Sequence, residues 1–590
     1  MMRFLTSLLF CLVLASCSAA LDREAFTVTR YQLDVQIDRA SHVMAVTGRL
    51  SLRNDSKSPQ KSVVLQVSSS LSWNGIAFNG KPIEWIGNDY TSDIDHTGHL
   101  AEAISTLPQA VLPSGTIDLD VQYGGTVTPD ATRLTRMGAP EEMALRNDWD
   151  QISESFTAIR GLGYVVWYPV SIPAVSMSDG NAVFEAIDAW KLRHLRSELD
   201  AHVSVITGGA KLCLAGNVLT STCGEASETS DPRTGERTTQ VSNRIRLNGL
   251  GNSVPVFAAA EYTKLDRPGI VVFHIHDNTS LAKDYAAAAE ANEPVLNEWL
   301  PPSSLQTPVI IELTDANANP YQSGSVLFTP LRESHESTLE LLLMPVQVAA
   351  RFSSPRRWIE EGLQRFLQAL SVERRSGRKA ALQFLDEYLA PLVKAEEVVT
   401  QEANANPKSG ADHSADDTLV NTADEILLRG KGSFVFWMLR DMLGDAALQR
   451  ALAAYRPAAD VSPAYLQGLL EEGRKRDLEW FFDDWVYRNR GLPEFRVDNV
   501  YSRPILEGPN KGYLVTVTIE NLGGAGAEVP VSIQTPAGEK SLRVLVKAHQ
   551  KGSGRLQITD AATRAVVNDG SVPEINSDNN TFEVPASPAL

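Results

Sequence analysis

Histidine and glutamate side chains are the residues of this chain best suited to hold a metal ion for hydrolysis. A hydrolytic zinc site needs three protein ligands and an open position for water. A common helical source is H-E-x-x-H, in which two histidines share one helix face and the glutamate acts as general base. No H-E-x-x-H occurs in the sequence. The closest fragment is His335-Glu336, with Leu339 at the position of the second histidine.

Two more histidines are candidates for a shared metal. His274 and His276 alternate in an apolar stretch that predicts a strand, so both imidazoles would point to one face. Paired histidines are more often surface or cleft residues than ligands, and a lone histidine at a helix start, such as His335, is more often a surface residue. The sequence has neither a G-x-S-x-G segment nor a P-loop.

The first 17 residues predict export. Arg3 is followed by a short apolar run, too short to span a bilayer, and then by LASC, which ends at Cys17. Small residues before a cysteine suit a lipoprotein signal peptidase, and Cys17 would become the lipidated N-terminus. The alternative is ordinary cleavage after the small residues SAA at 18–20, which leaves no lipid. In both cases we expect the mature chain to leave the cytoplasm. With the lipid we expect a protein anchored in the bacterial cell envelope, on the periplasmic or outer-membrane surface; without it, a soluble protein.

The two cysteines of the folded body predict a disulfide. Cys213 and Cys223 stand either side of a turn-like Ala-Gly-Asn segment, and an exported protein meets an oxidising compartment. The alternative is a metal pair. The spacing does not favour it, because it is not C-x-x-C and no histidine follows nearby.

Composition restricts the class of protein. The 590 residues carry 54 Lys and Arg against 72 Asp and Glu, a net charge of -18. This argues against nucleic-acid binding, which needs clustered Lys and Arg. Hydrophobic residues make up 43% and charged residues 21%, as in ordinary globular proteins. The length exceeds what one core supports, so we expect several domains.

Hydrophobic patterning divides the chain after its leader into three regions. Residues 21–265 alternate apolar and polar positions, with Gly, Pro, Asn and Asp between them, which predicts an antiparallel β domain. Residues 266–492 mix short buried strands with stretches of helical spacing. Within them, residues 396–417 are polar and lack aromatic residues, which predicts a flexible loop. Residues 493–590 return to alternation, which suits a β-sandwich.

Five ordered segments link the chain to a known family. They are WYPVSIP at 167–173, FAAAEY at 257–262, WIEEG at 358–362, LRGKG at 428–432 and DLEWFFDDW at 477–485. Together they resemble the zinc aminopeptidases of the membrane alanyl aminopeptidase type, which are gluzincin metallopeptidases. The resemblance covers about residues 25–495. It implies an N-terminal β domain followed by a thermolysin-like α/β and helical domain, while the C-terminal residues resemble an immunoglobulin-like adhesion module of exported bacterial proteins.

The resemblance assigns Glu361 the position of the family's glutamate zinc ligand. Counted back by the family's spacing, the H-E-x-x-H positions fall on Thr338, Leu339 and Leu342. Leucine cannot bind a metal, and threonine is a poor zinc ligand. A forward shift of the register changes nothing, because no histidine stands between residues 336 and 412. The pattern leaves open whether Glu361 faces a cleft or solvent.

Two further parts of the family's mechanism are absent. The family binds the substrate amine with the glutamate of G-x-M-E-N, and the closest segment here, GSVLF at 324–328, has no carboxylate. The family's oxyanion-binding tyrosine precedes Lys-Gly, where this chain has LLRG at 427–430. Arg429 could donate to an oxyanion or be a surface charge. We also expect Pro345 to kink its helix.

These observations favour a family member without catalytic activity and without a cofactor. We expect an envelope protein that binds or scaffolds peptides or other envelope proteins, contacts the membrane through its lipid anchor and binds no nucleic acid. The alternative is an active zinc-dependent metallopeptidase that uses non-standard ligands, such as His335, Glu336 and Glu361.

Overall fold

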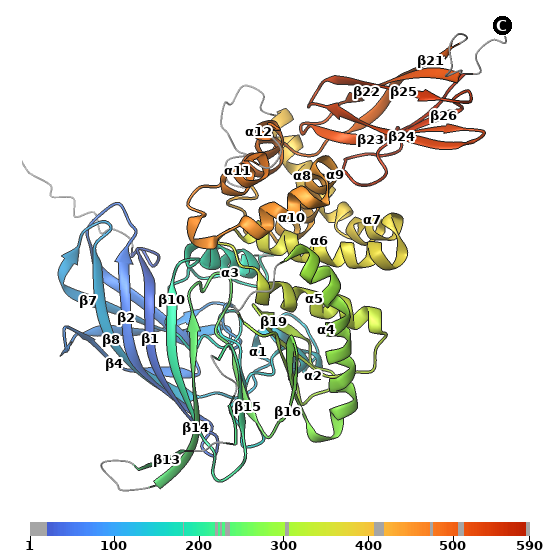
Figure 1. Ribbon diagram of the computed structural model, residues 1–590. Coiled ribbons are helices and arrows are strands. Elements are labelled where there is room, and N and C mark those ends of the chain that lie inside the picture. Colours follow the sequence, from blue (N-terminus) through green and yellow to red (C-terminus); the bar gives the residue numbers. More distant parts are fainter. Residues whose placement is uncertain are drawn as a thin grey trace, which may run out of the picture.

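The chain forms four successive regions: β-rich, α/β, helical, and β-rich again (Figure 1). The proposed signal peptide and Cys17 lie outside the described residues. No helix among these residues combines the length and the apolar character that a membrane crossing requires. The computed structural model describes residues 21–180, 182–218, 222–224, 227–230, 237–300, 306–405, 418–472, 476–505 and 512–585.

The N-terminal region is built on an eight-stranded sheet with one buried face. Tyr31, Leu33, Val35 and Ile37 of the first strand are buried, and the residues between them are exposed. In spatial order the strands are β13 (Ser227–Ser230), β14 (Arg237–Leu247), β10 (Glu198–Ile206), β1 (Phe26–Asp38), β2 (Val43–Asn54), β8 (Thr116–Thr126), β4 (Leu71–Phe78) and β5 (Lys81–Pro82).

The sheet is mixed rather than purely antiparallel, which corrects the prediction. β1 and β10 run parallel, whereas the other pairs in the sheet are antiparallel. A parallel pair needs a long connection, and here the chain returns to β1 only after passing through β2–β9 and three helices. Local alternation cannot reveal such a long-range pairing.

Two smaller sheets and three helices complete this region. The first sheet contains β3 (Gln60–Ser68), β7 (His99–Val111) and β6 (Trp85–Thr91). The second contains β12 (Thr222–Cys223), β11 (Cys213–Gly216), β15 (Phe257–Ala260) and β9 (Phe156–Ile159). The helices, which the sequence pattern does not predict, are α1 (Thr132–Arg136), α2 (Glu141–Asn147) and α3 (Ala182–Arg193).

A five-stranded sheet forms the α/β region. Its order is β16 (Thr263–Arg267), β17 (Ile270–His274), β18 (Val309–Glu312), β20 (Val326–Thr329) and β19 (Tyr321–Ser323). β17, β18 and β20 are parallel, and β19 pairs antiparallel at the edge. α4 (Thr279–Trp299) shares an apolar core with the sheet and with α5 (Glu336–Arg351). β16 starts at Thr263, just before the predicted boundary at residue 265.

The helical region follows α5. Its elements are α6 (Arg357–Ser376), α7 (Arg378–Asp386), α8 (Leu389–Ala405), a π-helical turn (Ile426–Lys431), α9 (Gly432–Leu443), α10 (Asp445–Ala454), α11 (Tyr465–Glu472), α12 (Glu479–Phe482) and a second π-helical turn (Asp483–Tyr487). α6 buries Trp358, Ile359, Leu363 and Phe366 on one side, so its other side is free to line a site.

α8 differs from the predicted loop. Residues 396–405 continue this helix, and residues 406–417 lie outside the described residues. Glu and Ala favour helices even in a polar stretch, and Pro407 is the first proline after the helix. The buried Glu396 also accepts a hydrogen bond from Lys431 at 2.7 Å, which fixes the helix to the bundle.

The C-terminal region contains two sheets whose inward residues share one core. Val515 and Val517 of the first sheet and Val529 and Val531 of the second are buried in it. The first sheet contains β21 (Phe495–Ile505), β22 (Gly512–Asn521) and β25 (Lys551–Ile558). The second contains β24 (Gly538–Val546), β23 (Ala527–Thr535), β26 (Arg564–Val567) and β27 (Thr581–Glu583). The immunoglobulin-like identity of this region stays a prediction.

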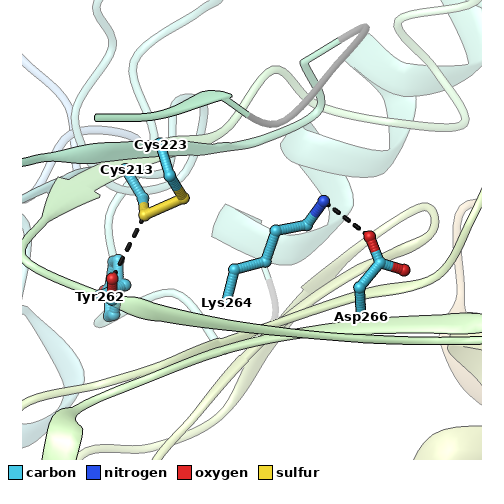
Figure 2. The surroundings of a disulfide bond; sticks show 5 residues. All are labelled: Cys213, Cys223, Tyr262, Lys264 and Asp266. Atoms are coloured by element: carbon cyan, nitrogen blue, oxygen red, sulfur yellow. Dashed lines mark hydrogen bonds and ion pairs between the residues drawn. A yellow bond between two sulfur atoms is a disulfide. The ribbon is translucent and has the colours of Figure 1, made fainter. Parts of the chain in front are cut away.

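Cys213 and Cys223 form a disulfide between the paired strands β11 and β12, with their α-carbons 4.0 Å apart. Figure 2 shows that the bond lies beside the start of the α/β region. The sulfur of Cys213 lies 3.3 Å from the carbonyl oxygen of Tyr262, and Lys264 pairs with Asp266 on β16 at 2.8 Å. The disulfide therefore joins β11 to β12 next to the point where the chain passes from the first region to the second.

Candidate functional site

A cleft of about 700 Å³ lies where the N-terminal, α/β and helical regions meet. α3 contributes one wall, β19 and α5 contribute another, and α6 with the first π-helical turn closes the end. Its lining combines apolar, neutral polar and charged side chains. Both the volume and the mixed lining are typical of ligand sites in proteins.

The α5 wall is apolar. Leu341, Leu342, Pro345 and Ala349 line the cleft, at the spacing of one helix face. The helix continues through Pro345. Proline cannot donate to the carbonyl of Leu341 four residues earlier, and the side-chain amide of Gln368 on α6 donates to that oxygen at 2.7 Å. The expected loss of a hydrogen bond is thus repaired by the neighbouring helix.

The degenerate motif positions lie on different sides of α5. Leu342 lines the cleft together with Glu361, as the positions of two metal ligands would. Thr338 is exposed one turn earlier, and Leu339 is buried in the core between α4 and the sheet. The α5 wall therefore presents a leucine to Glu361 at a position where the zinc aminopeptidases that the sequence resembles have an imidazole.

Two arginines neutralise Glu361. Arg429 donates from Nε to Oε2 at 2.8 Å, and Nη2 of Arg357 lies 3.9 Å from Oε1. Burial raises the pKa of the Glu361 carboxyl, but the arginines outweigh burial and hold that pKa below its usual range. Glu361 faces the cleft, and its charge is balanced by protein cations.

α3 holds the second half of this charged network. Asp188 binds Arg357 at 2.9 Å and Lys191 at 3.3 Å, and the side chains of Asp188 and Arg357 are almost completely buried. Arg357 therefore bridges a carboxylate of the N-terminal region and one of the helical region. At the rim, Glu425 lies 3.6 Å from Arg429.

Two glycines bring Arg429 to Glu361. A β-carbon on Gly362 would lie 2.7 Å from the carbonyl carbon of Gly432, so only glycine lets α6 and α9 approach this closely. Arg429 sits in the π-helical turn that leads into Gly432. Such turns often occur at functional sites because they shift a side chain out of the α-helical register.

Glu360 is the second cleft carboxylate. Burial raises its pKa to about 8, and one oxygen accepts a hydrogen bond from the backbone of Ser354 at 2.6 Å. Glu360 is therefore largely protonated at neutral pH and adds little negative charge to the cleft.

The other candidate ligands do not converge on the cleft. His335 and Glu336 are exposed at the start of α5 and are not among the lining residues. His274 is buried at the end of β17, whereas His276 is exposed in the short helical turn after it. The expectation that both imidazoles share one strand face is wrong, because the strand ends at His274.

The segment in the amine-binding position also lines the cleft. Gln322, Ser323, Gly324 and Leu327 contribute to the wall, and none of them carries a charge. A substrate ammonium group would find no carboxylate on this wall, and an unpaired buried cation is costly.

The residues present do not fit zinc. Glu361 is already held by two guanidinium groups, and Leu342 cannot be a ligand. Among the described residues, no group of three or more His, Cys, Asp or Glu side chains has an arrangement that could hold a metal ion.

The sequence pattern does not predict the α3 wall. Phe184, Asp188 and Lys191 line the cleft at intervals of three to four residues, so they share one helix face. The absence of Gly and Pro from 182 to 193 was the signal that could have revealed this helix.

Comparison with known proteins supports the fold. No protein-family model matches the sequence. No protein of curated function matches it at a significant level. Legionella pneumophila aminopeptidase A, in complex with aspartic acid, is similar at a TM-score of 0.57 and 12% identity, over 93% of this chain and 59% of that chain. An M1 zinc metallopeptidase from Deinococcus radiodurans, 16% identical, matches 78% of this chain and 94% of its own with a TM-score of 0.46. The likeness to the Legionella protein shows that the chain has an aminopeptidase fold.

Proposed function

We propose that this protein binds peptides in the aminopeptidase cleft without cleaving them. The observation that carries the proposal is the ion pairing of Glu361 with Arg429 and Arg357, opposite an apolar α5 wall. A guanidinium group on each side of the family's ligand position opposes a divalent cation there. Without a metal to activate water, the scaffold has no nucleophile to direct at a peptide bond.

The cleft keeps features that suit an extended chain. β19 is the edge strand of its sheet, and its Gln322 and Ser323 line the cleft. The free backbone groups of an edge strand can pair with an added strand, which is a common mode of peptide recognition. Peptides and segments of envelope proteins are therefore the ligands we propose.

Export and lipid anchoring belong to the same proposal. A protein anchored through Cys17 at the periplasmic or outer-membrane surface would meet such ligands outside the cytoplasm. The test is a Cys17→Ser variant in a bacterial host, compared with the unchanged protein by membrane fractionation and lipid labelling. We expect the label and the membrane association to disappear in the variant. Equal labelling of both proteins would contradict the anchor.

Three measurements test the central claim on one purified sample. We expect no stoichiometric zinc, no chelator-sensitive turnover of aminoacyl reporter substrates, and saturable binding of short peptides by calorimetry. Chelator-sensitive turnover that is lost in Glu361→Ala would show an active zinc peptidase. Failure to bind any peptide would refute the binding role.

A further inference from the structure

The apolar part of the cleft has an exposed aromatic residue at its edge. Phe184 on α3 lines the cleft and is 61% exposed. A single exposed aromatic side chain needs no explanation by itself, but one that lines a cleft gives a ligand apolar surface to cover. Met177 and Ile187 line the same cleft, and methionine adapts to side chains of different shape.

Phe184 lies on the same helix face as the charged network. Asp188 follows one turn later and Lys191 two turns later, so the α-carbon of Phe184 lies about 6 Å along the helix axis from that of Asp188, at 1.5 Å per residue. When part of a ligand contacts Phe184, the adjoining groups of the same ligand therefore lie close to Asp188 and Lys191.

Every charged side chain that lines the cleft already has a protein partner. Glu361 forms ion pairs with Arg429 and Arg357. Asp188 pairs with Arg357 and Lys191. Glu425 pairs with Arg429. Glu360 accepts from Ser354, and Arg133 donates to two backbone carbonyls. A charged terminus of a ligand would share these partners with the protein rather than meet an unpaired opposite charge, so its net gain is small.

Charge balance therefore favours a neutral ligand, and the apolar side chains of the cleft are free to contact it. We propose that the cleft recognises an uncharged apolar stretch inside a polypeptide, seated between Phe184 and the Leu341–Pro345 stripe of α5, and that it does not require a free chain terminus. This inference rests on the proposed peptide-binding function and specifies its ligand class.

Calorimetry with one short peptide in three forms tests the inference. The first has free termini and a central Phe-Leu-Phe, the second is the same peptide acetylated and amidated, and the third is blocked with Ser-Ser-Ser at the centre. We expect the first two to bind within about threefold of each other, and the third at least about tenfold more weakly, as the loss of buried apolar side chains implies.

A matched pair of variants assigns the binding to the cleft. Phe184→Ser should weaken binding of the blocked apolar peptide by roughly tenfold, because about half of a phenylalanine surface is no longer covered. Tyr501→Ser removes an equally exposed aromatic ring, 62% exposed on β21, and should leave affinity unchanged. Both side chains are exposed, so unchanged thermal unfolding confirms that each variant folds.

The outcomes separate this inference from the proposed function. Loss of binding on acetylation or amidation, with the free peptide still bound, would overturn the inference and leave peptide binding intact. Equal affinities of the Phe184 and Tyr501 variants would also overturn it. Absence of binding by every peptide would overturn the proposed function itself.

Discussion

Replacing Glu361 by glutamine distinguishes an ion-paired carboxylate from a zinc ligand. The change keeps the shape of the side chain and removes its charge. A hydrogen bond to a charged group contributes about 1.5–3 kcal/mol. Arg429 is 41% exposed, so solvent screens part of this interaction, and Arg357 keeps Asp188 at 2.9 Å. We expect a loss of about 1 kcal/mol of unfolding free energy at pH 7.

The pH dependence of this loss gives an independent check. The pKa of Glu361 is lowered in the folded protein, so the pair stabilises the fold at pH values above the unfolded pKa of about 4.3. As the pH falls below that value towards the folded pKa, the carboxylate is protonated and the stabilisation is lost. The difference between the protein and its Glu361→Gln variant should therefore shrink below about pH 4.

Urea unfolding followed by tryptophan fluorescence measures both effects, since Trp358 and Trp437 are buried around this part of the bundle. Glu425→Gln is the matched control: it removes a rim carboxylate near the same arginine and should cost less than about 0.5 kcal/mol. A zinc ligand would behave differently. Zinc at about 100 times its dissociation constant would stabilise the unchanged protein by about 2.7 kcal/mol and the variant far less, and that result would refute the ion-pair explanation.

Three further changes test the surroundings of the site by the same unfolding assay. Glu360→Gln should stabilise the fold more and more as pH rises from about 4.3. The Glu360 carboxyl has a folded pKa of about 8, so it destabilises the fold once the same carboxyl ionises in the unfolded chain. An effect that does not change with pH would contradict this. Gly362→Ala should lower the free energy of unfolding by more than about 2 kcal/mol, because the new β-carbon would clash with the backbone of Gly432. Gly468→Ala on α11, where a β-carbon meets no other atom, should raise the free energy of unfolding by up to about 1 kcal/mol. Gln368→Ala should lower the free energy of unfolding by about 1 kcal/mol. The loss should be much smaller in a Pro345→Ala background, where the backbone N–H of residue 345 can donate to the carbonyl of Leu341. Equal losses in both backgrounds would show that Gln368 does not replace the missing hydrogen bond.

The order of the regions could be predicted because it depends on local periodicity. Alternation in β1 and the apolar runs of β17 and β18 predict which side chains are buried. The spacing of the buried positions in turn indicates a strand or a helix. The parallel pairing of β1 with β10 could not be predicted, because it joins segments far apart in the chain. α1 and α2 are too short to show a period of 3.6 residues.

The candidate site could be predicted in one half only. Glu361 follows from its place in a recognisable segment, and its spacing identifies Leu342 on the facing helix. The partners of Glu361 could not be predicted: Arg357 is four residues away on its own helix, but Arg429 reaches it through the glycine contact at Gly362. Periodicity carries no information about which loop lies beside which helix.

The bridge that Arg357 forms with Asp188, where both side chains line the cleft, also affects binding kinetics. Hinge opening between the N-terminal and helical regions would separate Arg357 from Asp188 and leave these two nearly buried charges without each other as partners. The free-energy cost of this separation is several kcal/mol. The α3 wall and the α6 end of the cleft are thus held at one spacing, and a ligand enters a receptor in which these two parts are already in place. Association should then be a single step. The observed binding rate should rise linearly with ligand concentration, with an association rate constant in the ordinary range of about 10⁵–10⁷ M⁻¹s⁻¹. It should show no plateau from slow domain closure.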